Sequence, residues 1–153
     1  MYLQNRGKHM MEIRIKKMGE DVKLPKYQHF GEDCGMDLRS RYEYILKPGE
    51  YKLIKTGLKL AIPEGYGGFV YPRSGLALKK GITVLNADGV IDPGYRGELG
   101  VILINHSDQE FKINKDDRIA QLIIHKVYPI EWQEVDSLTD SNRSEGGFGH
   151  TGK

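Results

Sequence analysis

The chain has 153 residues, enough for one domain that buries a core without disulfide or metal support. Its one cysteine excludes an intramolecular disulfide, and no apolar run approaches the roughly 20 residues of a membrane span. The net charge of +2, with 29% charged residues of both signs, argues against nucleic-acid binding, because such domains concentrate positive charge.

Residues 1–10 show no hydrophobic periodicity, whereas an alternating segment begins at Met11. We expect residues 1–10 to be a disordered extension or a cloning remnant. The following residues 11–135 are predicted to form one β domain, and residues 136–153 a flexible C-terminal arm. The polar N-terminus does not resemble a secretion signal, so a cytoplasmic protein is expected.

From Met11 onward, short strand-like runs alternate with turn signals. The 19 glycines, about 12% of the chain against a usual ~7%, and the nine tyrosines also favour strands and turns. The runs cover residues 42–46, 51–62, 69–71, 82–85, 89–91, 99–104, 111–113 and 119–127. Many short strands separated by regular turns predict an all-β sandwich, barrel or jelly roll.

One segment, residues 74–80, is predicted to be a short helix. Ser74 is a candidate N-cap, two lysines stand in the last turn, and Gly81 is placed to end the helix. Arg73, Ser74 and Gly75 then form a candidate anion site from a guanidinium, a hydroxyl and free N–H groups. The alternative is a capped surface helix with an exposed arginine.

Residues 86–98, NADGVIDPGYRGE, hold the densest group of turn residues and functional side chains. Asp88 and Gly89 predict a hairpin, and Asp92 begins a second turn. Between them, Val90 and Ile91 are expected to clamp Asp92 from the apolar side, a setting that suits a general base. Asp92 can equally be an ordinary turn residue, and Tyr95 an ordinary strand aromatic.

The C-terminal residues 143–153, RSEGGFGHTGK, include the GxxxxGK part of a phosphate-binding P-loop. No Ser or Thr follows the lysine and no strand precedes the glycines, so the P-loop interpretation fails. A glycine-rich segment with one cation, Arg143, and one ring, Phe148, remains. These are the groups needed to close over a charged, planar ligand.

Five segments together resemble the motifs of the trimeric dUTP pyrophosphatases (dUTPases). They are CGMDLRS at 34–40, PRSGLA at 72–77, NADGVIDPGYRGE at 86–98, RIAQL at 118–122 and RSEGGFGHTG at 143–152. The resemblance implies a jelly-roll-like domain of the dUTPase β-clip type that assembles as a homotrimer. It also implies hydrolysis of dUTP to dUMP and pyrophosphate with Mg²⁺, which lowers dUTP and supplies dUMP for thymidylate synthesis.

The resemblance assigns roles to the residues of the third segment. Asp92 corresponds to the aspartate that activates the water attacking the α-phosphate. Asn86 and the backbone at Gly89, Val90 and Ile91 would recognise the uracil edge. Tyr95 would pack against the deoxyribose and leave no room for a 2′-hydroxyl, an exclusion by shape.

The other segments would hold the triphosphate. Arg73, Ser74 and Gly75 would bind phosphate oxygens, Gln121 would lie near the phosphates, and Asp37 would contact the water shell of Mg²⁺. Because Mg²⁺ gives up its waters reluctantly, we expect phosphates and waters rather than a protein cage around it.

The C-terminal arm completes the implied site. Arg143 would contact the terminal phosphates and Phe148 would stack over the uracil, with Gly149 beside it close to the ligand. In this family the arm reaches an active site at an interface between subunits. His150 stands where the family usually has serine, which leaves the detailed contacts of the arm open.

Two further departures bear on the alternatives. Cys34 replaces a usual alanine and is expected to be a small buried residue. The Pro93-Gly94 pair is common in the related dCTP deaminases, so a deaminase or bifunctional enzyme is the rival interpretation. Those enzymes carry a catalytic glutamate where this chain has Ile102, which disfavours both. A non-catalytic nucleotide-sensing protein on the same fold is the third possibility.

Overall fold

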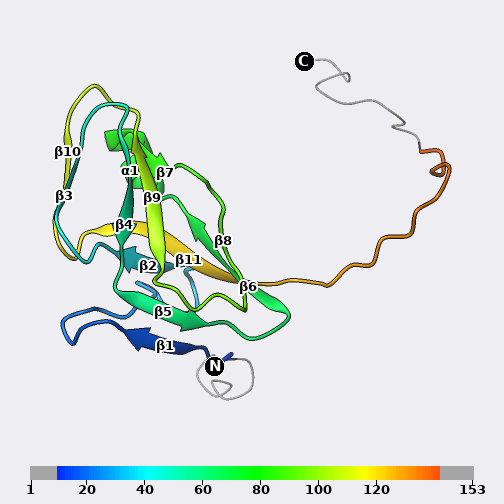
Figure 1. Cartoon of the computed structure of the whole chain (residues 1–153). Coiled ribbons are helices and arrows are strands. Elements are labelled where there is room, and N and C mark those ends of the chain that lie inside the picture. The colour runs from blue at the N-terminus through cyan, green and yellow to red at the C-terminus, as the bar shows by residue number, and fades with distance from the viewer. Residues whose placement is uncertain (1–9, 142–153) are drawn as a thin grey trace.

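The computed structural model describes residues 10–141 (Figure 1). These residues form eleven strands and one helix. In chain order the elements are β1 (Arg14–Lys17), β2 (Met36–Arg39), β3 (Tyr44–Leu46), β4 (Tyr51–Lys55), β5 (Leu58–Ala61), β6 (Tyr66–Tyr71), α1 (Ser74–Lys80), β7 (Ile82–Val84), β8 (Gly89–Ile91), β9 (Gly100–Asn105), β10 (Phe111–Ile113) and β11 (Arg118–Lys126).

The strands form two main antiparallel sheets that enclose the core. One has the order β2-β11-β6-β8, and the other has the order β4-β9-β7. The pairs β1-β5 and β3-β10 extend the structure at its edges. Both main sheets contribute to one buried apolar cluster, the first through residues such as Leu38 and Leu122, the second through Ile54 and Leu103. The predicted all-β, jelly-roll-like class with one short helix is confirmed.

The predicted run over residues 51–62 is two strands rather than one. Gly57, with φ of 74°, separates β4 from β5. Beyond this turn the chain changes partner, because β4 pairs with β9 whereas β5 pairs with β1. Positive φ is a conformation that glycine adopts at little cost, so the break lies at the one glycine of the run.

The hairpin predicted at Asp88 and Gly89 does not form. β7 pairs with β9 in one main sheet, whereas β8 pairs with β6 in the other. The turn over residues 85–88 therefore carries the chain from one sheet to the other. The packing of strands distant in sequence overrides the local preference for a hairpin.

Helix α1 lies beside β7, and its predicted end is confirmed (Figure 1). Gly81 has φ of 64°, and its N–H group donates to the carbonyls of the last turn. The predicted range 74–80 is confirmed, but the candidate N-cap was wrong, because Arg73 is the N-cap and Ser74 is already helical. No side chain caps this end of the helix.

Cys34 is exposed, so the prediction of a small buried residue was wrong. It precedes β2 and follows residues 23–32, which are mostly exposed, and no apolar residue between Val22 and Leu38 is buried. The resemblance placed Cys34 in a motif but did not indicate whether its side chain is buried.

After β11, residues 127–141 form neither strand nor helix and run away from the two sheets (Figure 1, orange). Their large apolar side chains are exposed, including Ile130 at 70% and Trp132 at 87%. Residues 1–9 and 142–153 lie outside the described range, so the expected N-terminal extension and most of the expected arm over 136–153 are not described. Within residues 10–141, no helix is long and apolar enough to cross a membrane.

Candidate active site

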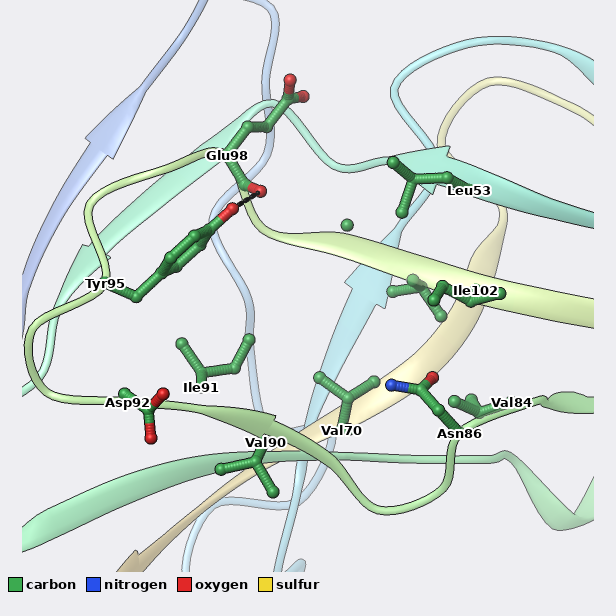
Figure 2. A pocket seen from close by; sticks show the side chains of 13 residues that line it. Leu53, Val70, Val84, Asn86, Val90, Ile91, Asp92, Tyr95, Glu98 and Ile102 are labelled. Atoms are coloured by element: carbon green, nitrogen blue, oxygen red, sulfur yellow. Dashed lines mark hydrogen bonds between the residues drawn. The ribbon is translucent and has the colours of Figure 1, made fainter.

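A pocket of about 230 Å³ opens between β8 of one main sheet and β9 of the other (Figure 2). Its walls are aliphatic, and polar groups stand at its ends. The aliphatic side chains come from both main sheets: Leu53, Val70, Val84, Ile91, Val101 and Ile102. The polar side chains are those of Asn86, Asp92, Tyr95 and Glu98. A small apolar cavity with a few polar groups suits a planar organic ligand.

Six of the residues assigned by resemblance line this pocket: Asn86, Gly89, Val90, Ile91, Asp92 and Tyr95. Asn86 lies on the turn before β8, and Asp92 follows the last residue of that strand. Gly89 is buried against Val70 of β6, with which it pairs. The carboxyl group of Asp92 is exposed, so water reaches it.

The apolar clamp predicted around Asp92 does not form. Val90 and Ile91 are neighbours in a strand, so their side chains point to opposite faces. Ile91 points into the pocket, whereas Val90 points to the other side of β8 and is 62% exposed (Figure 2). The alternation of side chains between the two faces of a strand therefore decides which of these neighbours points into the pocket.

The turn after Asp92 is held by hydrogen bonds. The Tyr95 N–H donates to the Asp92 carbonyl at 3.1 Å. The Arg96 guanidinium donates to the carbonyls of Pro93 and Tyr95 at 2.5 and 2.8 Å. The Tyr95 hydroxyl donates to the Glu98 carbonyl at 3.0 Å, which places the ring along one side of the pocket (Figure 2).

Glu98 was not among the predicted site residues, although it ends the third segment. Its side chain is only 12% exposed and accepts hydrogen bonds from the Gly57 N–H at 2.9 Å and from Lys55 Nζ at 3.1 Å. The hydrogen bond and the negative charge of Glu98 raise the pKa of Lys55 above its ordinary value. These partners lie more than 40 positions earlier in the chain, so no local pattern indicated them.

A second group of polar residues lies where β2, β11 and the end of β6 meet. The Asp37 carboxylate pairs with Arg73 Nε at 3.4 Å and with Arg118 Nη1 at 3.2 Å. Arg73 also donates to the Arg118 carbonyl at 3.0 Å, and Gln121 Nε2 donates to the Pro72 carbonyl at 3.1 Å. We call Asp37, Arg73, Arg118 and Gln121 the arginine cluster.

Arg118 is the member of the arginine cluster that the sequence did not single out. It stood first in the segment RIAQL, but only Gln121 was assigned a role there. Arg118 and Asp37 are 81 positions apart, and the antiparallel pairing of β2 with β11 brings them together. Both guanidinium groups are aligned by one carboxylate, which leaves the cluster with a net positive charge suited to phosphate.

Ser74 and Gly75 begin α1 and are exposed. They follow Arg73 directly in the chain, so the predicted anion site is adjacent to the arginine cluster rather than to the pocket. The N–H groups of Leu76 and Ala77 donate to the Arg73 carbonyl at 3.0 Å.

The pocket and the arginine cluster lie on opposite faces of the sheet β2-β11-β6-β8. Gln121 is directly opposite Asp37 on β2 and Tyr71 on β6, so these three side chains share the outer face. Val70, next to Tyr71, is buried on the inner face and lines the pocket. None of the four residues of the arginine cluster lines the pocket.

The described residues offer no ready-made metal cage. Between residues 10 and 141, no group of three His, Cys, Asp or Glu side chains is placed to hold a metal ion. Both oxygens of Asp37 already face guanidinium groups. This donor set fits contact with the waters of a hydrated Mg²⁺ better than direct ligation.

Comparison with known proteins places these features in one family. The family model described as dUTPase matches residues 20–152. The chain belongs to the dUTPase family. Among curated relatives, the deoxyuridine 5'-triphosphate nucleotidohydrolases of Alkaliphilus metalliredigens and Nautilia profundicola are each 52% identical to this dUTPase chain over 143 residues. Both matches cover 94% of this chain, and they cover 99% and 100% of those proteins.

Solved structures of dUTPases share the fold. The Staphylococcus bacteriophage 80alpha dUTPase with dUPNHPP has a TM-score of 0.86 and 29% sequence identity, covering 94% of this chain and all 100% of that one. A mutant dUTPase from phage phi11 of S. aureus, described as coordinating a structural Mg(II) ion, has a TM-score of 0.78 and 26% identity. That match covers 85% of this chain and 100% of the phage chain.

Proposed function

We propose that this dUTPase-family protein hydrolyses dUTP to dUMP and pyrophosphate. The observation that carries the proposal is the pocket between β8 and β9, which combines aliphatic walls with Asn86 at one end and Asp92 and Tyr95 at the other. In this proposal the base and the sugar lie in the pocket, and the phosphates extend out of it. The relatives named deoxyuridine 5'-triphosphate nucleotidohydrolase support the same substrate.

Asp92 acts as the general base in this proposal. Its exposed carboxylate stands at the pocket rim, within reach of solvent water. The water oxygen attacks the α-phosphorus while its proton passes to Asp92, and the bond between the α-phosphorus and the bridging oxygen breaks. The products are dUMP and pyrophosphate, and general-base help of this kind contributes about 10²–10⁴-fold to a rate.

The arginine cluster binds the phosphates. Arg73, Arg118 and Gln121 offer N–H donors around the Asp37 carboxylate, and Ser74 and Gly75 add the exposed start of α1. When bound to the triphosphate, Mg²⁺ neutralises phosphate charge and makes pyrophosphate a better leaving group. Asp37 would hold a water of its hydration shell, since both carboxylate oxygens face arginines.

The active site is proposed to form between subunits of a homotrimer. In one chain the pocket and the arginine cluster lie on opposite faces of a sheet, so a second copy must supply the cluster that meets a nucleotide in the pocket. The exposed apolar side chains of residues 127–141 also support contact with another protein surface, because exposed apolar patches mark interaction sites. Arg143, Phe148 and Gly149, which lie outside the described residues, would close the site from the arm.

A dCTP deaminase is the weaker candidate. Ile102 of β9 lines the pocket, at the position where the deaminases carry their catalytic glutamate. An aliphatic side chain transfers no protons. Glu98, an acidic residue that also lines the pocket, already accepts hydrogen bonds from the Gly57 N–H and from Lys55.

The proposal is tested by incubating the protein with each deoxynucleoside triphosphate and Mg²⁺ while measuring pyrophosphate and ammonia. Pyrophosphate from dUTP alone is the expected result. Ammonia from dCTP would instead establish a deaminase, and tight dUTP binding without either product would establish a sensing protein. Analytical ultracentrifugation of the same sample gives the oligomeric state, and a monomer with full activity would contradict the proposed intersubunit site.

A further inference from the structure

The position of the Tyr95 ring is decided by the residues that follow it in the turn. The hydroxyl donates to the Glu98 carbonyl, and the ring lies directly over the backbone of Gly97. A Cβ atom added at Gly97 would overlap the Tyr95 hydroxyl and the adjacent ring carbons. Gly97 is not one of the glycines with positive φ, so its backbone conformation does not require glycine. Space for the Tyr95 ring is therefore what requires glycine at this position.

Glu98 is in turn fixed from both sides. Its carboxylate accepts hydrogen bonds from Lys55, the last residue of β4, and from the Gly57 N–H in the turn that follows. The next residue, Leu99, donates its N–H to the Leu58 carbonyl at 2.7 Å. The carbonyl that receives the Tyr95 hydroxyl is thus held by a neighbouring part of the sheet rather than by the turn alone.

We propose that Gly97 and Glu98 are positioning residues that fix the Tyr95 ring and thereby set the preference of the pocket for 2′-deoxyribose over ribose. This inference rests on the proposed function, in which the ring packs against the sugar. Rejection of an added hydroxyl by shape works only while the wall that it strikes cannot move. A ring displaced from Gly97 would open the space that a 2′-hydroxyl needs.

The first test compares Gly97→Ala with Gly94→Ala. Both change the same turn by one methyl group, but a Cβ at Gly94 meets no atom within 4 Å. We expect Gly97→Ala to lower the ratio of kcat/KM for dUTP to that for UTP by about tenfold, a typical effect of one methylene in a pocket. Gly94→Ala should leave the ratio unchanged.

A double-mutant cycle shows whether Gly97 acts through the ring. Once Tyr95→Ala has removed the ring, adding Gly97→Ala should cause no further fall in the dUTP/UTP ratio, because coupled residues are not additive. An equal further fall in the double mutant would overturn the inference. A general loss of stability lowers both activities together and leaves the ratio unchanged.

Glu98 provides a test that does not depend on the folding of Gly97→Ala. Glu98→Gln keeps an oxygen for the Gly57 N–H, whereas Glu98→Ala keeps neither that acceptor nor the pair with Lys55. The ratio should fall slightly in the first variant and severalfold in the second. An unchanged ratio in folded, active Gly97→Ala and Glu98→Ala proteins overturns this inference alone. Wild-type protein that hydrolyses no dUTP overturns the proposed function, and this inference with it.

Discussion

At the residue scale, Asp92, the proposed general base, is poorly shielded from solvent within one chain. Its carboxyl group follows β8 at the pocket rim, where it is exposed, and Val90 turns away from the pocket on the other side of the strand. In the proposed intersubunit site, the bound nucleotide and groups from a second subunit would supply the shielding that one chain lacks.

Replacement of Asp92 by asparagine keeps the size of the side chain and removes the proton acceptor. We expect the rate of dUTP hydrolysis to fall by at least ~10²-fold, the scale of general-base catalysis. Because the side chain is exposed, the melting temperature and the affinity for a non-hydrolysable dUTP analogue should stay close to the wild-type values. Steady-state kinetics and calorimetry measure both, and wild-type turnover in the variant would remove Asp92 from the mechanism.

At the scale of elements, the pairing of β2 with β11 assembles the arginine cluster. Leu122 and Ala120 bury their side chains on one face of β11, and the intervening Gln121 stands beside Asp37 on the other. Gly35, just before β2, leaves room for the Gln121 side chain, because a Cβ there would lie 3.1 Å from it. The same pairing brings Arg118 to Asp37.

Arg118→Gln removes one of the two guanidinium groups on Asp37 and leaves Arg73 in place. A hydrogen bond to a charged group is worth about 1.5–3 kcal/mol, so kcat/KM for dUTP should fall by roughly tenfold or more. Arg39→Gln is the matched control, since Arg39 of β2 donates to the Asp116 carbonyl and not to Asp37. Equal activity losses in both variants would show that Arg118 supports only the sheet.

At the scale of the whole molecule, the buried core of the described residues ends before the expected C-terminal arm begins. The buried apolar residues of the described chain lie between Val22 and Leu122. Deletion of residues 143–153 should therefore leave the melting transition intact, whereas the loss of the Arg143 contact alone should lower kcat/KM for dUTP by at least ~10-fold. Calorimetry and kinetics on the truncated protein test this, and a lost transition would make the arm part of the folded core.

The charge pairs of the surface predict how stability depends on pH. The hydrogen bond from Lys115, at 2.6 Å, lowers the pKa of Asp21 below its ordinary value of 3.8. Backbone N–H groups of Lys47 and His29 lower the pKa values of Glu50 and Asp33. Depressed carboxyl pKa values stabilise the fold above the unfolded-state values, and this stabilisation is lost as the pH falls through the folded-state values.

We therefore expect a constant melting temperature from neutral pH to about pH 5, and a decline below about 4.5, the ordinary pKa of glutamate. Asp21 is exposed, and Asp33 and Glu50 are partly exposed, so each contributes little and salt weakens the effect. Melting curves between pH 3 and 7 measure the decline. Asp21→Asn should flatten it, and an unchanged slope in that variant would show that Asp21 is not among the groups responsible.

The local features were the most predictable. Strand β10 occupies the predicted residues 111–113, and α1 ends at Gly81, because alternation and a left-handed glycine are written into short stretches of sequence. Which strands pair was not predictable in the same way. The run over 51–62 divides into two strands that pair with β9 and β1, and the strands on either side of Asp88 pair with β9 and β6. These partners are distant in sequence, so no local pattern indicated them.

By itself, the sequence determined the family and the residue types available for binding a nucleotide, because five separated segments carry the family motifs. It also determined the all-β class, because short runs of alternating apolar and polar residues are separated by turn signals. Only the tertiary structure decided where those residues lie. It joined Arg118 to Asp37, fixed Glu98 on Gly57 and Lys55, and set the pocket and the arginine cluster on opposite faces of a sheet. Such contacts depend on strand register and on the side of each pleat, which follow from burying one common core.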